Sequence, residues 1–159
     1  MTAAAWAVLA VLAAGLIGAA YVRLAPTDPA RWHMDLTGLA PAGLAALPPG
    51  PEAVQPQQGG AWAALAAGPE KAAGLLAQLD AIAQDSPRTL RLAGSVEEGR
   101  ITWQTRSALW GFPDYTTAQD VPQGVLLFAR QRFGSEDLGV NAARLRDWLA
   151  RLPGQGLAP

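Results

Sequence analysis

Arginine, carboxylate and aromatic side chains gather in two stretches of the C-terminal half of the sequence. The first stretch covers residues 105–115 and the second covers residues 130–144. Guanidinium groups bind carboxylates and phosphates through paired hydrogen bonds, and aromatic rings line many small-molecule pockets. Such residues could therefore bind an anion. The candidates are Arg106, Trp110, Phe112, Asp114, Arg130, Arg132, Asp137, Asn141 and Arg144.

These residues allow two interpretations. In the first, which we favour, arginines from two strands form an ion-pair network with Asp114 and Asp137 from two loops. In the second, Arg106, Arg130 and Arg132 donate hydrogen bonds into a pocket for a small anion or a lipid headgroup, and the two aromatic side chains form its walls. Neither interpretation contains a nucleophile paired with a base.

The chain offers few residues for catalysis or metal binding. It has no cysteine, which excludes disulfides, thiolate metal sites and cysteine nucleophiles. His33 is its only histidine, so a site with two histidine ligands is impossible, and a catalytic triad would require His33 to fold back onto the domain. We expect no enzymatic activity, no cofactor and no metal.

The net charge of −1 gives no sign of a nucleic-acid-binding surface. Lys71 is the only lysine, and the arginines are scattered along the chain instead of forming a basic run. We therefore expect no nucleic-acid partner.

The N-terminal residues 1–23 are expected to form a transmembrane anchor. Residues 3–22 carry no charge, and a helix of this length crosses a hydrocarbon core of roughly 30 Å. Trp6 and Tyr21 lie near its ends, where interfacial aromatic residues are common. A cleaved signal peptide ending at Ala20 is the alternative, although no basic residue precedes the apolar run.

Small residues recur at every fourth position of this segment, at Ala10, Ala14 and Gly18. That spacing allows two membrane helices to approach closely, so these residues are candidates for helix packing. Chance in an alanine-rich run is the competing explanation.

Residues 24–60 are rich in proline and glycine and show no sustained period, so we expect an extended, semi-rigid tether. Trp32 follows the anchor closely, and we expect it to lie at the bilayer surface.

Residues 61–159 are expected to form an α+β domain with a small antiparallel sheet of about four strands and two helices. Apolar residues repeat at helical spacing between Pro69 and Pro87, and again from Asn141 to Leu152. The expected strands are residues 88–94, 100–107, 115–119 and 124–132. Asp137 or Asn141 can cap the last helix.

Two motifs resemble the bacterial family known as domain of unknown function 1499. The first, T-R-x-x-x-F-x-D with local variation, falls on Thr105, Arg106 and Asp114. The second, R-x-G-x-x-D-x-G-x-N-x-x-R, fits Arg132, Gly134, Asp137, Gly139, Asn141 and Arg144. The segment VRLAPTDPARWH is similar to the region after the anchor in alphaproteobacterial members of the membrane-anchored type. The Asn-Cys segment of other branches is missing here.

The resemblance implies the fold and the location but no activity. Its members often look exported or lipid-anchored, which places the domain of this single-pass protein on the periplasmic side of the bacterial inner membrane. The positive-inside rule alone, applied to Arg23 and Arg31, favours the cytoplasm instead. We expect a non-enzymatic accessory or interaction protein that docks on a membrane complex or another envelope protein. The alternative is a domain that binds a small anion or lipid headgroup.

Overall fold

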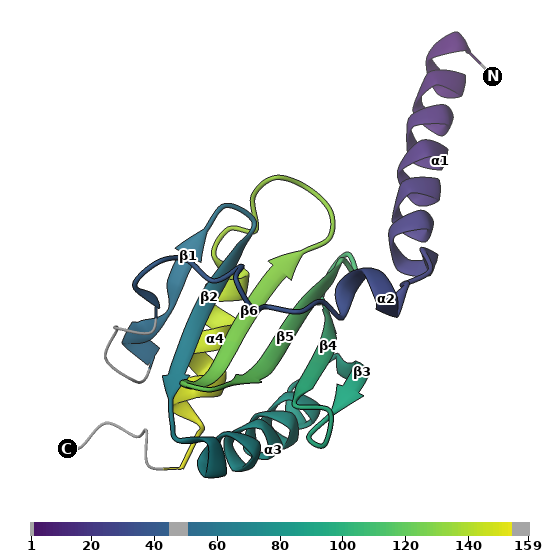
Figure 1. Cartoon of the computed structure of the whole chain (residues 1–159). Helices are drawn as coiled ribbons and strands as arrows, with labels where there is room; N and C mark the ends of the chain where they lie inside the picture. Colours follow the sequence, from purple (N-terminus) through teal and green to yellow (C-terminus); the bar gives the residue numbers. More distant parts are fainter. Residues whose placement is uncertain (1, 45–50, 154–159) are drawn as a thin grey trace.

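A computed structural model describes residues 2–44 and 51–153 of the chain (Figure 1). The long helix α1 (Ala3–Leu24) projects away from the domain and has no buried residue. Its length and composition suit a single membrane span, and a signal sequence would have the same features. The predicted N-terminal apolar helix is therefore confirmed.

The domain is built on one antiparallel sheet. Over the described residues the sheet has six strands in the order β1-β2-β6-β5-β4-β3. Neighbouring strands are antiparallel throughout. The strands are β1 (Gln55–Gln57), β2 (Gly60–Ala66), β3 (Thr89–Ser95), β4 (Arg100–Arg106), β5 (Pro113–Val121) and β6 (Gly124–Gln131).

The prediction of about four strands was wrong because it missed β1 and β2. Strand β2 is buried on both faces, so its sequence GAWAALA reads as a continuous apolar run without the alternation that marks a half-buried strand. β1 contains Pro56, which lowers strand propensity and is tolerated here because β1 lies at the edge of the sheet. The α+β class and the antiparallel sheet are confirmed.

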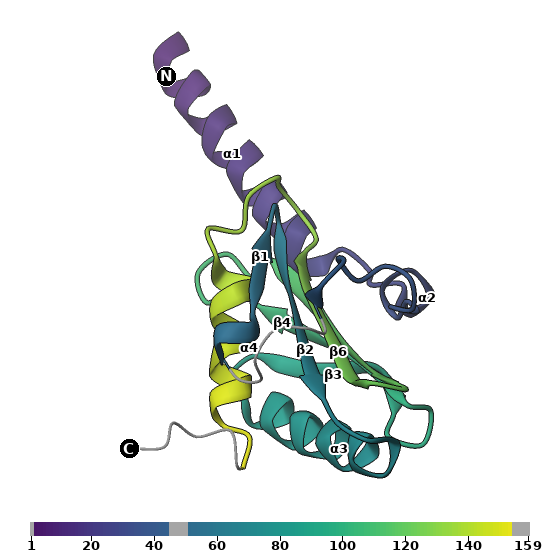
Figure 2. The same ribbon diagram turned by 60° about the vertical axis from the view of Figure 1, so that its left-hand side comes forward.

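Two helices cover one face of the sheet. The described residues contain four α-helices in all, whereas the sequence predicted three, namely the anchor and two helices in the domain. α3 (Pro69–Asp85) and α4 (Val140–Ala150) pack against this face, and Figure 2 shows α4 and α2 on opposite sides of the strands. The main core between helices and sheet includes Leu76, Trp103 and Trp148. The Trp103 and Trp148 rings meet edge to face, with centroids 5.5 Å apart.

The segment after α1 lies across the other face of the sheet. We call residues 25–44 the strap; it contains the short helix α2 (Pro29–Trp32). Leu36 and Leu44 of the strap are buried against Trp62 of β2 in a second, smaller core. The expected extended tether is therefore packed onto the domain over these residues. The sequence shows no sustained period here, but Trp32, Leu36 and Leu44 each bury a large apolar side chain against the domain.

Trp32 also differs from its expected position at the bilayer surface. Only 8% of its surface is exposed, and its ring stacks on Tyr115 of β5 at a centroid distance of 4.0 Å. The backbone of Trp32 has partners here as well, because Thr117 of β5 and Arg130 of β6 donate to its carbonyl at 3.4 and 3.3 Å.

Candidate functional site

The predicted site residues do not form one cluster. By their position along the strands, Asp114 faces α4, whereas Arg130 faces the strap. The structure thus brings Asp114, Asp137, Asn141 and Arg144 together on the helix side. Arg130 and Arg132 lie on the strap side, and Arg106 lies beside the loop of residues 107–112.

The helix-side group connects the end of the sheet to α4. Arg144 Nη2 donates to Asp114 Oδ2 at 3.3 Å, and the two side chains are only 11% and 15% exposed. Arg144 Nη1 also donates to the Asn141 amide oxygen. Burial raises the pKa of Asp114 despite the opposing effect of Arg144. Asp114 therefore forms an ion pair, but its partner is Arg144 of α4 and not one of the strand arginines that the favoured interpretation named.

Asp137 caps α4. Its carboxylate accepts hydrogen bonds from the backbone N–H groups of Gly139 and Asn141, at 3.1 and 3.0 Å. Partial burial acts to raise the pKa of Asp137, but the hydrogen bonds from Asn141 and Gly139 outweigh it and the pKa lies below its ordinary value. The predicted capping role of Asp137 is confirmed, whereas Asn141 lies inside the helix.

Arg130 and Arg132 hold the strap instead of binding carboxylates. Arg132 Nη2 donates to the carbonyl of Pro26 at 3.0 Å, and Arg130 Nη2 donates to the carbonyl of Trp32 at 3.3 Å. The Arg130 guanidinium also lies 4.7 Å from the centre of the Trp32 ring, a cation–π distance. Burial lowers the pKa of Arg130, and the nearby Arg31 lowers it further. The expected pairing with Asp114 or Asp137 was wrong for these two arginines, because they lie on the strap side of the sheet whereas Asp114 and Asp137 lie on the helix side.

Arg106 lines an open pocket at the C-terminal end of α1. The pocket has a volume of about 490 Å³ and is lined by Arg23, Arg88, Leu90, Arg106, Ser107, Ala108 and Gly111. We call this cavity the arginine pocket, because Arg23, Arg88 and Arg106 line it. Sequence reasoning included Arg106 but missed the other two, since nothing in the spacing of Arg23 and Arg88 predicts that they meet.

Backbone carbonyls orient these guanidinium groups. Arg23 donates from Nη2 to Leu109 and from Nε to Trp110, at 2.9 and 3.2 Å. Arg106 Nη1 donates to the carbonyl of Gly111 at 3.0 Å, and Arg88 Nε donates to the carbonyl of Arg106 at 3.1 Å.

None of the three arginines forms a salt bridge within the described part of the chain. Arg88 also has a left-handed backbone, with φ of 59°, which is a strained conformation for a residue with a side chain. The lining residues of this pocket thus include three arginines and no acidic residue.

The two aromatic candidates lie beside this pocket but do not line it. Trp110 is 57% exposed and Phe112 is 39% exposed, and the Phe112 ring lies 6.2 Å from that of Phe133. Their expected role as pocket walls is not seen, because the loop turns its backbone toward Arg23 and its side chains outward.

His33 does fold back onto the sheet, although the resulting group is not suited to catalysis. Its Nε2 lies 2.7 Å from Glu98 Oε1, and its Nδ1 lies 2.9 Å from Thr102 Oγ1. This acid, base and hydroxyl order resembles a triad, but Thr102 is 0% exposed and also bonds to Thr117, so a substrate cannot reach its hydroxyl. The hydrogen bond from His33 lowers the pKa of Glu98. His33 therefore fastens the strap.

Two other sequence predictions concern metals and helix packing. No group of three or more metal-binding side chains occurs among the residues that the structure describes. Ala10, Ala14 and Gly18 lie on the exposed surface of α1, and their packing against a second helix stays a prediction.

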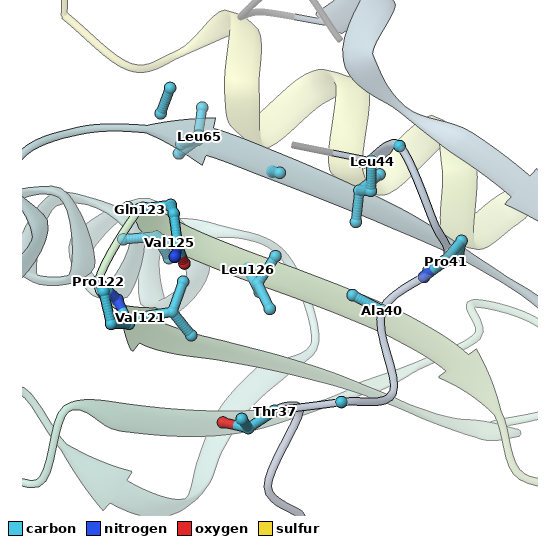
Figure 3. Close-up of a pocket in the computed structure, with 15 residues that line it drawn as sticks. Thr37, Ala40, Pro41, Leu44, Leu65, Val121, Pro122, Gln123, Val125 and Leu126 are labelled. Atoms are coloured by element: carbon cyan, nitrogen blue, oxygen red, sulfur yellow. The ribbon is translucent and has the colours of Figure 1, made fainter. Parts of the chain in front are cut away.

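A second pocket lies between the strap and the end of the sheet remote from α1. Its volume is about 670 Å³, and Figure 3 shows Leu44 and Ala40 of the strap facing Leu126 of β6 and Val121 of β5 across it. Its lining is mostly apolar and includes no charged side chain. A pocket of this kind suits an apolar group of a ligand or partner.

Comparison with known proteins gives one match. The family described as "Protein of unknown function (DUF1499)" matches residues 43–152, which include the whole sheet, α3 and α4. None of the curated proteins and none of the solved structures matches this chain. The matched span covers both arginine-containing motifs. The chain belongs to the DUF1499 family.

Proposed function

We propose that this protein is a membrane-anchored, non-enzymatic binding protein of the bacterial envelope whose arginine pocket binds an anionic phosphate group, from a lipid headgroup or a free ion. The observation that supports the proposal most is the meeting of Arg23, Arg88 and Arg106 in one open pocket without a carboxylate partner in the described residues. α1 is the membrane span in this proposal. The domain lies in the periplasm, because members of the family often look exported or lipid-anchored.

The arginine pocket has side chains that bind phosphate, and it lies at the level expected for lipid headgroups. Guanidinium groups match phosphate oxygens through paired hydrogen bonds, and each arginine here uses only some of its N–H groups on carbonyls. Arg23 belongs to the last turn of α1, where a spanning helix reaches the headgroup layer.

The test is to titrate the full-length protein in a non-ionic detergent with short-chain phosphatidylglycerol, short-chain phosphatidylcholine and inorganic phosphate, by isothermal titration calorimetry. We expect phosphatidylglycerol to bind and phosphatidylcholine not to bind. Arg88→Gln and Arg106→Gln should each weaken binding on the order of tenfold, because each removes a charge-assisted hydrogen bond. Arg146→Gln is the matched control, since Arg146 is exposed on α4 away from the pocket.

Circular dichroism of each variant checks that it folds. Binding of inorganic phosphate with the same dependence on Arg88 and Arg106 would identify a free anion as the ligand. Equal binding by the wild type and both pocket variants would refute the proposed site.

The apolar pocket favours a second candidate, docking of an accessory protein on a membrane complex or envelope partner. Leu126→Glu places a charge in that pocket, whereas Leu39→Glu changes a strap residue that does not line it. If a partner binds there, affinity purification from native membranes in mild detergent should lose it only with Leu126→Glu. A partner that both variants retain would contradict docking at this pocket.

A further inference from the structure

Exposed apolar side chains gather next to the end of α1. Outside α1, most of the large exposed apolar side chains of the described residues lie in the β4–β5 loop, in the β6–α4 connection or at the first residue of α4. The two exceptions are Leu39 and Leu90. Leu109 and Trp110 of the first loop are 72% and 57% exposed. A soluble domain gains nothing from such a concentration, which indicates an interaction surface.

Contacts with α1 fix the position of this surface. Arg23 donates to the carbonyls of Leu109 and Trp110, and a side chain at Gly111 would come within 3.0 Å of Arg23. On the neighbouring connection, the Phe133 ring lies 6.2 Å from the ring of Tyr21. Figure 2 shows the β6–α4 connection rising toward α1.

The depth of these residues follows from the helix. Tyr21 lies one turn before the end of α1, about 4.5 Å along the axis at 1.5 Å per residue. A ring at the level of Tyr21 therefore lies in the interfacial layer of a bilayer that α1 spans, where aromatic side chains are favoured on both sides of the hydrocarbon core.

We propose that the edge formed by Leu109, Trp110, Phe112 and Phe133 inserts into the interfacial layer of the same bilayer. The bilayer is the occupant because the edge is continuous with the membrane helix, and because the arginine pocket beside it supplies cations at headgroup height. The inference rests on α1 as a membrane span, and it does not depend on headgroup binding, since burial of apolar side chains needs no anionic lipid.

Insertion would give the domain a second attachment to the membrane. A domain attached by a single helix can tilt relative to the bilayer. Attachment through both α1 and the inserted edge would hold the sheet in one orientation relative to the bilayer. The remote apolar pocket then faces away from the membrane, because the β5–β6 turn that lines it lies at the opposite end of β5 from the β4–β5 loop.

The absence of cysteine allows a direct test with single labels. Leu109→Cys carries an environment-sensitive NBD fluorophore. The matched control is Gln78→Cys, at an exposed position of α3, a helix that lies far from α1 in Figure 1. Both full-length variants are reconstituted into phosphatidylcholine vesicles at one protein per several thousand lipids. We expect the label at residue 109 to emit at shorter wavelength and to be quenched at least twofold more by shallow spin-labelled lipids than the label at residue 78.

The outcomes separate this proposal from the others. Insertion that is equal in phosphatidylcholine and in mixtures with phosphatidylglycerol supports it even if the arginine pocket binds no headgroup. Equal water exposure of the two labels would overturn it. A change at residue 109 that appears only at high protein density would also overturn it, because a second copy of the chain would then cover the edge.

Discussion

Replacing Arg144 by methionine is expected to lower the free energy of unfolding by about 3–5 kcal/mol at neutral pH, as breaking a buried ion pair typically does. The variant leaves the Asp114 carboxylate, which is 15% exposed, without its cationic partner. Methionine retains much of the volume of the arginine stem, so the loss reports mainly on the charge. Urea denaturation of the full-length protein in detergent, followed by tryptophan fluorescence, measures it.

The destabilisation should depend on pH with a defined sign. The pKa of Asp114 in the folded protein lies above its ordinary value of 3.8, because burial penalises the carboxylate. The folded state therefore binds this proton more tightly than the unfolded chain, and that contribution to stability is lost as pH rises through the folded pKa. Without Arg144 the pKa rises further, so the loss in Arg144→Met should be larger at pH 7 than at pH 4.

The double variant Asp114→Asn, Arg144→Met is the control. It removes both charges, so it should recover most of the stability that the single variant loses. If the double variant is as unstable as Arg144→Met, the loss comes from packing and the argument from an unpaired carboxylate fails.

The elements with a clear period were predictable from the sequence. α3 shows apolar residues at helical spacing between Pro69 and Pro87, and α4 begins within one residue of the predicted start at Asn141. β4 alternates, with Ile101 and Trp103 in the main core and Thr102 on the other face. β2 was not predictable in the same way because it is buried on both sides, although a short apolar run bounded by glycines is compatible with a buried strand.

The site was only partly predictable, because local spacing predicts caps but not long-range contacts. The cap formed by Asp137 depends on residues within four positions of it. The arginine pocket instead depends on Arg23, which meets Leu109 from 86 positions away. Likewise, Arg130 and Arg132 looked like ligand donors because the sequence gives no sign that the proline-rich strap returns to bind them.

The second prediction with a large expected effect concerns the attachment of the strap to the sheet. Leu36→Asp is expected to release the strap from the sheet while the sheet and its helices stay folded. Leu36 is 0% exposed in the smaller core, and its backbone N–H donates to Gln119 Oε1 at 2.7 Å. A carboxylate there has no cationic partner among its described contacts, so detachment costs less than burial. Truncation of a buried leucine alone costs about 2–5 kcal/mol, which corresponds to at least a 30-fold faster hydrogen exchange of strap amides.

Hydrogen exchange followed by mass spectrometry on the full-length protein distinguishes local release from unfolding. Strap peptides should lose protection, whereas peptides from β4, β5 and β6 should keep it, because their main core lies on the opposite face. Leu39→Asp is the control, since Leu39 is 49% exposed and its exchange should not change. Release would also free Arg130 and Arg132 from the carbonyls of Trp32 and Pro26. Loss of protection in the sheet to the same extent would instead mean that strap and sheet unfold as one cooperative unit, and that local release is wrong.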